Sequence, residues 1–434
     1  MAGNLIQAYS KMRLAAKFNK SLCALLLFST GMPSQSSPEH SDITVDIYLE
    51  EDRRLRGESD TSATAAFEVT VTNGFGSGSY EAGSTVHIWS DHNPRTQVVT
   101  NWSGDHDLLT DIGEWHTSFV MPPRNVTLTA ELTDTSFDLV EAQFDGRDRL
   151  KTVRYFIPPN PKGFVHLAHG TGGSGAIIER IEAGYIARVL AEAGYGVWAT
   201  DAEEVDIGDQ DGNNKIRWNV SPTANNVEFA NLTRIVEQFV DRQLIPKKLP
   251  NFMIGMSNGG AFALLAGSAL NLNAAVVYGA SGSQRVAAAT ETPTAWFLCE
   301  KDDNFQVDNN RSAQNHAALQ DRKIATELHI HGPSSVYDQR FARIDGIDEA
   351  TSTAIANELR LNEHIDSLGL LLQDGNDIGI TIRKTPKEYP VISRLQPRRK
   401  AFEVVQQLRI MRSNHRMYDD YARRTLAFIQ AHTP

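Results

Sequence analysis

Residues 255–259, with the sequence GMSNG, constrain the fold of this chain more than any other segment. The apolar run 251–254 before them indicates a short buried strand, and the run 260–266 after them has the composition of an apolar helix. A serine on so sharp a strand-to-helix turn exposes its hydroxyl at the end of the strand, and small flanking residues let the backbone turn. The segment therefore predicts a strand, a tight turn and a helix, with Ser257 as a candidate nucleophile.

A glycine-rich loop follows a second candidate strand. The apolar run 163–168 leads into HGTGGSG at residues 169–175. Backbone N–H groups of such a loop can face a developing oxyanion, together with the N–H of the residue that follows a nucleophile. The candidate donors are Asn258 and either Thr171 or Gly172. Phosphate binding is the alternative, but the loop has neither the GK[ST] ending nor the GxGxxG spacing of the common phosphate-binding loops.

These two motifs, with the chain order Ser, Asp, His, resemble the α/β-hydrolase superfamily, in particular its esterase and lipase-like members. The resemblance covers roughly residues 150–434. It implies an α/β fold, in which a doubly wound, mostly parallel sheet carries helices on both faces and a serine nucleophile at its carboxyl edge. It also implies a carboxylic-ester hydrolase that uses no metal and no cofactor.

The same resemblance places the acid of the site directly after the strand predicted at 294–299. Asp302 fits the usual spacing best, and Asp303 is the alternative. Both carboxylates could instead cap the helix expected over 308–322.

The histidine of the site has two candidates. The last strand is predicted at 325–331, and the superfamily's histidine follows that strand, so His331 is eligible. His415 lies in a polar loop just before the amphipathic stretch 421–429. A histidine that opens the final helix matches the superfamily pattern, which favours His415 and places a long insertion before it. His415 would then take the proton of the weakly nucleophilic serine, and Asp302 would hold the imidazole tautomer.

Composition narrows the range of partners. The chain has 434 residues and a net charge of −11, and it contains no cluster of basic residues. This balance argues against nucleic acids and anionic lipid surfaces as partners, and it does not choose among neutral substrates. The resemblance implies a small-molecule or polymeric ester as the substrate. The length is that of two or three folding units.

The N-terminus resembles a secretory signal peptide. A basic region at 12–20 precedes a short apolar run at 22–28, and small residues near Ser36 offer a cleavage site. The apolar run is too short to cross a membrane, which takes about 20 residues. Residues 1–36 are thus expected to be removed from a secreted or periplasmic protein, with a buried helix as the alternative. The polar, charged residues 37–65 indicate a linker.

Residues 66–134 predict a small β-rich module. Short alternating segments such as 67–71 are separated by glycine-rich turns. The module resembles a divergent internalin B-repeat of secreted bacterial proteins, which implies a β-grasp-like fold and an accessory role with a surface or polymer as partner. Trp89, Trp102 and Trp115 form either its core, which is favoured, or an aromatic binding face.

Residues 135–434 form the expected catalytic domain, with a cap-like insertion at about 332–399. Helices are expected at 348–361 and near 364–372. Because the insertion lies between the last strand and the histidine, it is a candidate lid over the acyl pocket. A peripheral decoration is the alternative.

Three aspartates follow the strand predicted at 196–200, and carboxylates are ligands that calcium prefers. They are Asp206, Asp209 and Asp211. Their spacing does not complete an EF-hand loop, so a solvated loop is favoured and no metal is predicted.

The sequence therefore predicts a secreted serine hydrolase of carboxylic esters. A peptidase or amidase, or a polyester depolymerase, would use the same residues, because the leaving group is not visible in a sequence. A non-catalytic surface-binding protein on a hydrolase scaffold is the alternative from another class. Such a protein has no need of the serine turn, the glycine-rich loop, the acid and the histidine together.

Overall fold

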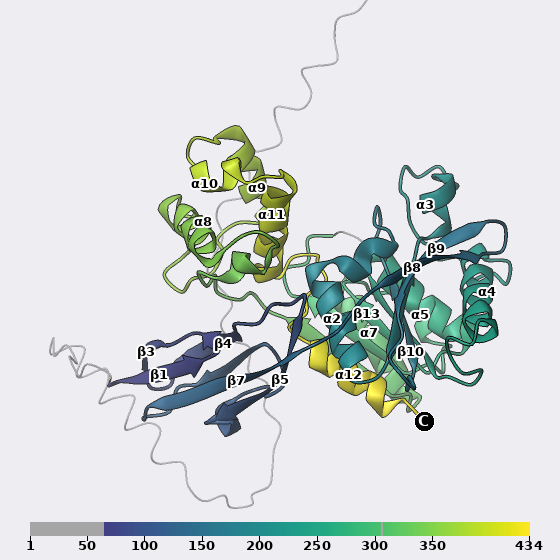
Figure 1. Cartoon of the computed structure of the whole chain (residues 1–434), viewed down its shortest axis with the longest axis horizontal. Coiled ribbons are helices and arrows are strands. Elements are labelled where there is room, and N and C mark those ends of the chain that lie inside the picture. Colours follow the sequence, from purple (N-terminus) through teal and green to yellow (C-terminus); the bar gives the residue numbers. More distant parts are fainter. Residues whose placement is uncertain (1–64, 305–306) are drawn as a thin grey trace, which may run out of the picture. The chain divides into compact units, whose positions relative to one another are not determined.

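An eight-stranded sheet organises the larger part of this computed structural model, which describes residues 65–304 and 307–434 (Figure 1). Its strands are β8 (Val140–Asp145), β9 (Leu150–Phe156), β10 (Phe164–Ala168), β11 (Gly196–Thr200), β12 (Asn251–Met256), β13 (Ala274–Tyr278), β14 (Thr294–Cys299) and β15 (Thr326–His331). They lie in the order β15-β14-β13-β12-β10-β11-β9-β8. Strands β10 to β15 pair in parallel, and β9 and β8 close one edge in antiparallel pairs. The predicted α/β fold with a mostly parallel sheet is confirmed.

The expected signal peptide at 1–36 and nearly all of the linker at 37–65 lie outside the described residues. In the part of the chain that the structure describes, no helix combines the length and the apolar character that crossing a bilayer requires.

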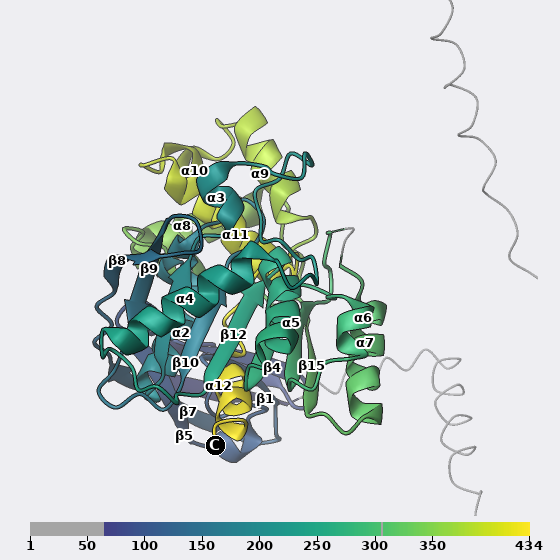
Figure 2. The same cartoon turned by 90° about the vertical axis from the view of Figure 1, so that its right-hand side faces the viewer.

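Helices cover both faces of the large sheet (Figure 2). One face packs on α2 (Ile181–Glu192) and α12 (Ala422–Ala431), and the other on α4 (Val227–Asp241), α5 (Asn258–Leu270) and α7 (Asn309–Asp321). Successive side chains of a strand point to opposite faces of a sheet. Accordingly Ile254 of β12 is buried in the first core, and its neighbour Met253 is buried in the second.

The strand order reverses between β10 and β12, which are neighbours in the sheet. From β10 the chain passes to β11 on one side, and from β12 it passes to β13 on the other. At such a point the loops leave in opposite directions and open a crevice at the carboxyl edge, where open α/β sheets bind their ligands. The HGTGGSG loop follows β10 and the GMSNG turn follows β12, so both motifs lie at this crevice.

Residues 66–134 form two small sheets, which confirms a β-rich module. The strands are β1 (Ala66–Thr72), β2 (Gly74–Phe75), β3 (Gly78–Glu81), β4 (Thr85–Ser90), β5 (Gln97–Gly104), β6 (His116–Val120) and β7 (Val126–Asp134). One sheet has the order β3-β1-β7-β5 and the other β2-β4-β6. All pairs are antiparallel except β1 with β7. The resemblance to an internalin repeat and the β-grasp-like fold stay predictions.

The three tryptophans of this module are buried, as expected of core residues. Trp102 belongs to the module's own core. Trp89 and Trp115 belong instead to a core that includes Tyr185 of α2. The Tyr185 hydroxyl also accepts a hydrogen bond from the N–H of Val99 at 3.2 Å. The module and the large sheet are therefore joined by a shared apolar core.

Helices fill the chain between β15 and His415. They are η3 (Arg340–Arg343, a 3₁₀ turn), α8 (Glu349–Leu361), α9 (Gly375–Lys384), α10 (Pro390–Arg394) and α11 (Arg399–Met411). Their apolar residues, such as Phe341, Leu359 and Leu408, bury a core of their own. The helical segment runs past the expected boundary at 399, because α11 continues to Met411.

The helix expected near 364–372 is wrong. The segment forms a tight reversal, with a bridge between Ile365 and Leu371. The Asp366 carboxylate accepts the N–H groups of Leu368 and Leu370 at 2.9 and 2.8 Å, and Gly369 has a φ of 80°. A short acid that bonds to the backbone two residues later stabilises a turn in place of a helix.

Candidate active site

Ser257 lies at the turn between β12 and α5 in a backbone conformation that few residues adopt. Its φ is 58° and its ψ is −121°. For a residue with a side chain, this conformation persists only where the surroundings enforce it. Its N–H donates to the carbonyl of Tyr278 at 2.8 Å, and its carbonyl accepts from Ala261 at 3.0 Å. The turn is thus fixed by β13 on one side and by the helix on the other.

The two glycines of GMSNG are required by close backbone contacts. A Cβ at Gly255 would lie 2.0 Å from the carbonyl oxygen of Gly259. A Cβ at Gly259 would lie 2.3 Å from the carbonyl oxygen of Ala168 and 2.4 Å from that of His169. These contacts pack the start of α5 against the end of β10. They bring the nucleophile candidate next to the glycine-rich loop.

Ser257, His415 and Asp302 form one chain of hydrogen bonds. Ser257 Oγ lies 2.8 Å from His415 Nε2, and His415 Nδ1 lies 2.8 Å from Asp302 Oδ2. Only 4% of the Asp302 side chain and 11% of the His415 side chain are exposed. A buried carboxylate that accepts from Nδ1 leaves Nε2 free to accept the serine proton. The arrangement can perform general-base catalysis on an attacking hydroxyl.

The two remaining candidates lie in other environments. Asp303 pairs with Arg409, with an N···O distance of 3.2 Å. His331 is buried at the end of β15 and stacks on Tyr418, with ring centroids 4.4 Å apart. Burial lowers the pKa of His331. The structure thus brings together Asp302 and His415, and it gives Asp303 and His331 structural contacts.

Asn304 is a residue that the sequence reasoning missed. Its Nδ2 lies 3.1 Å from His415 Nε2, and its N–H donates to Asp302 Oδ1 at 2.9 Å. It therefore contacts both the histidine and the acid of the chain of hydrogen bonds. Its position two residues after Asp302 is the feature of the sequence that could have indicated a role beside the acid.

The glycine-rich loop lies against the serine turn. A Cβ at Gly170 would be 3.3 Å from Ser257 Cβ. The N–H of Gly172 donates to the carbonyl of Ile216 at 2.8 Å, so this N–H is already used. Of the two candidate N–H donors to an oxyanion in this loop, the hydrogen bonding therefore favours that of Thr171. Asn258 is the first residue of α5, where backbone N–H groups have no acceptor within the helix.

Side chains that the sequence reasoning missed hold this loop in place. His169 Nε2 accepts the N–H of Ala202 at 3.1 Å, so Nδ1 carries the proton and donates to the Gly170 carbonyl at 2.8 Å. Burial lowers the pKa of His169, which keeps the ring neutral. Trp218 Nε1 donates to the His169 carbonyl at 3.0 Å, and the Trp218 N–H donates to Asn258 Oδ1 at 2.8 Å.

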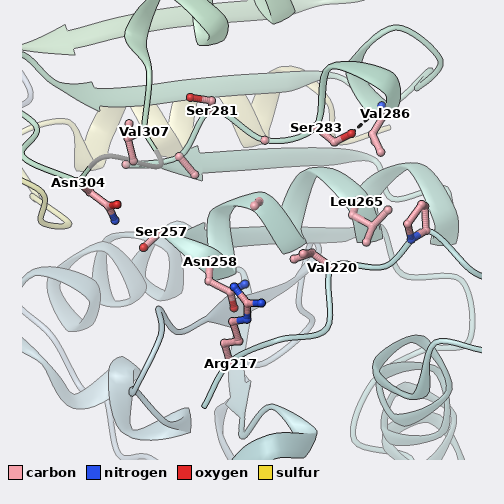
Figure 3. Close-up of a pocket in the computed structure, with 15 residues that line it drawn as sticks. Arg217, Val220, Ser257, Asn258, Leu265, Ser281, Ser283, Val286, Asn304 and Val307 are labelled. Carbon is pink, nitrogen blue, oxygen red and sulfur yellow. Dashed lines mark hydrogen bonds between the residues drawn. The ribbon is translucent and has the colours of Figure 1, made fainter. Parts of the chain in front are cut away.

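Two cavities meet at Ser257. The smaller one has a volume of about 240 Å³, and Figure 3 shows it with Val220 and Leu265 along one side. The larger one, of about 750 Å³, lies between the glycine-rich loop and α11. Ser257 and Asn304 line both cavities. An ester placed at Ser257 thus has separate space for its two halves.

The acidic segment after β11, which consists of α3 (Glu203–Ile207) and the loop that follows it, offers a partial ligand set. Carboxylate oxygens of Glu204, Asp209 and Asp211 lie within 4.8 Å of one another. Asp209 already accepts three backbone N–H groups, and Glu204 accepts those of Gln210 and Arg217. Asp206 contacts Lys151. These contacts show that the acids stabilise the local backbone. The absence of a metal stays a prediction.

Several solved structures match this chain at low identity. An esterase from Pyrococcus furiosus is 14% identical, with a TM-score of 0.34, over 45% of this chain and 82% of the esterase. A dienelactone hydrolase from Anabaena variabilis is 19% identical, with a TM-score of 0.35, over 52% of this chain and 97% of that chain. A ferulic acid esterase is 10% identical, with a TM-score of 0.36, over 45% and 90%. No family model and no curated protein matches the chain.

Proposed function

We propose that this chain is an exported serine hydrolase that cleaves carboxylic esters. The observation that carries the proposal is the chain of hydrogen bonds from Ser257 Oγ through His415 to Asp302, with 2.8 Å at both steps. A serine hydroxyl is a weak nucleophile at neutral pH, and an adjacent base is what activates it. The burial of Asp302 supports its role as the group that orients the histidine.

The proposed cycle has two balanced halves. Ser257 Oγ bonds to the ester carbonyl carbon while His415 Nε2 takes the hydroxyl proton. The bond between that carbon and the alcohol oxygen then breaks, and His415 gives its proton to the departing alcohol. Water repeats the sequence on the acyl-enzyme and releases the carboxylic acid. The N–H groups of Asn258 and Thr171 are the proposed donors to the oxyanion in both halves.

The larger cavity supports a covering role for the helical segment. Phe402, Gln406 and Ile410 of α11 line it together with Ser257 and His415. A helix over the reacting group can exclude water and limit the size of the substrate. We therefore keep the cap-like role of this segment as part of the proposal.

Hydrolysis of 4-nitrophenyl esters from acetate to palmitate tests the proposal. Ser257→Ala should abolish turnover with the fold intact by circular dichroism. Ser79→Ala is the matched control, because Ser79 is exposed on β3. Turnover that survives in Ser257→Ala would contradict the assignment of the nucleophile. No turnover at any chain length would redirect the search to amides, polyesters or a non-catalytic binding role.

Export and the role of the β-rich module belong to the same proposal. We expect the mature protein to begin near residue 37, which the mass of secreted protein would show. A surface or a polymer is the proposed partner of the module. Because the module shares its core with α2, binding to insoluble polyester or cell-wall material should be measured on the whole mature chain.

A further inference from the structure

Arg416 follows His415 directly and lines the larger cavity together with Ser257. Its side chain is only partly exposed, and its Nε is buried without a hydrogen-bond partner. Among the residues that the structure describes, no carboxylate lies within 4.0 Å of its guanidinium and no group accepts a hydrogen bond from it.

The other arginine that lines this cavity, Arg180, is paired, and so are two arginines outside the lining. Arg180 contacts Glu403 at 3.0 Å, and Arg409 contacts Asp303 at 3.2 Å. Arg343, which is buried, contacts Asp419 at 2.5 Å. Of the two arginines that line this cavity in the part of the chain that the structure describes, Arg180 is paired with an acid and Arg416 is not. A buried charge or donor that lacks a partner costs stability, so an unpaired group beside a reacting serine points to a ligand.

The carboxylates near the cavity are already engaged. Glu403 pairs with Arg180 and also with Arg399 at 3.4 Å. Glu182 accepts a hydrogen bond from Gln407 at 2.7 Å. Burial, followed by repulsion from Arg409, lowers the pKa of Arg416 to about 10. Attraction to Glu182, Asp303 and Glu403 acts in the opposite direction, and at neutral pH the guanidinium is still charged.

We infer that Arg416 binds a free carboxylate of the substrate, and that the enzyme prefers esters which carry such a group. A guanidinium offers a planar pair of donors that matches a carboxylate, and such charge-assisted hydrogen bonds are about twice as strong as neutral ones. A monoanion fits better than a phosphate dianion, because Glu182 and Glu403 also line the cavity and repel added negative charge. This inference rests on the proposed ester hydrolysis, since it names the substrate class of the same site.

The test compares acidic esters with neutral partners of nearly the same shape. One pair is 4-acetoxybenzoate and its methyl ester, with the carboxylate on the alcohol side. The second pair is mono-4-nitrophenyl glutarate and its methyl ester, with the carboxylate on the acyl side. The quantity measured is the acid-to-neutral ratio of kcat/KM in each pair. The pair with the higher ratio identifies the half of the ester that lies in the larger cavity.

Arg416→Met should lower that ratio by about tenfold to a hundredfold, which is the range for a hydrogen bond to a charged group. The change should come mainly from a higher KM for the acidic ester. Arg416→Lys should restore part of the ratio. Arg180→Met is the matched control, because its guanidinium lines the same cavity but is paired with Glu403. Its ratio should change by less than threefold. Equal ratios in the parent and Arg416→Met for both pairs would overturn the inference.

A binding measurement separates this inference from the proposed function. Calorimetry with 4-acetoxybenzoate on Ser257→Ala needs no turnover. Ser257→Ala should bind the acid at least tenfold more tightly than Ser257→Ala/Arg416→Met, even if neither ester is hydrolysed by the parent chain. Equal affinity of the two variants, with both folded by circular dichroism, would overturn the carboxylate site and leave ester hydrolysis to its own test.

Discussion

The Ser413 hydroxyl accepts a hydrogen bond from the N–H of Glu300 at 2.8 Å, and it thereby joins the loop of His415 to the loop of Asp302. Asn414 Nδ2 adds a second link to the carbonyl of Lys301 at 3.0 Å. Ser413 is fully buried. The distance between the acid and the histidine is therefore set by bonds just beside them in the chain.

Ser413→Ala should weaken this link. The change removes one of the two acceptors of the Glu300 N–H, whose other acceptor is the His331 carbonyl at 2.9 Å, and it removes the bond that the Ser413 hydroxyl donates to that carbonyl. Two such bonds contribute about 1–3 kcal/mol to the free energy of unfolding. We expect kcat to fall at least tenfold with little change in KM, because the histidine loses its position relative to the acid. Urea unfolding and ester kinetics on the same preparation check both effects. A stability loss with unchanged kcat would contradict the positioning role.

Gly259→Ala should destabilise the serine turn. Its Cβ would lie 2.3 Å from a backbone carbonyl oxygen that cannot move aside easily. We expect a loss of about 3 kcal/mol or more in the free energy of unfolding, or no soluble protein. Gly267→Ala is the control in the same helix, since its nearest contacts are the side chains of Ala275 and Thr292 at 3.2 Å. That change should be tolerated within about 1 kcal/mol. Equal effects at the two sites would be inconsistent with the close packing described.

The two histidine candidates should behave differently on substitution. His415→Ala should lower kcat by about 10⁴-fold or more, close to the effect of Ser257→Ala, because such residues act as a unit. His331→Ala should mainly lower the melting temperature, because that ring is buried against Tyr418. Steady-state kinetics and thermal unfolding distinguish the two effects. Loss of kcat in His331→Ala alone would show that the assignment is wrong.

The His87 ring should make the protein sensitive to mild acid. Burial, then repulsion from His116, lowers the pKa of His87 to about 4, whereas Asp420 acts in the opposite direction and His331 adds to the lowering. The unfolded chain binds a proton near pH 6.5 and the folded chain does not, so stability is lost as the pH falls from about 6.5 to 4. His87→Gln should flatten part of this slope in melting temperature against pH. His106→Gln, at a residue with a 43% exposed side chain, should leave it unchanged. A slope that is identical in all three proteins would contradict the role of His87.

Much of residues 135–434 could be predicted because the signals there are local. The strand at 294–299 is mostly apolar and ends close to Asp302, and residues 422–429 of the predicted amphipathic stretch lie within α12. The contribution of Trp218 could not be predicted in this way. Its bonds to His169 and Asn258 exist only because a long loop folds back over the sheet edge. No periodicity in the sequence encodes such a contact.

The association of the β-rich module with the part that holds the large sheet could not be predicted from the sequence either. Trp89 and Trp115 were expected to serve the module's own core, and they pack instead in a core shared with α2. His116 Nδ1 lies 2.6 Å from Asp420 Oδ1, across 304 residues of chain. Alternating patterns show that one face of a strand is buried, but they do not show which partner buries it.

Covalent labelling with a fluorophosphonate probe, followed by intact mass and peptide mapping, tests most directly whether Ser257 is an activated nucleophile. We expect one adduct per chain, on Ser257, and labelling at least a thousandfold slower in His415→Ala, because the base that activates the hydroxyl is gone. An unlabelled chain, or an adduct on another serine with the Ser257 peptide unmodified, would show that Ser257 is not a nucleophile activated by His415.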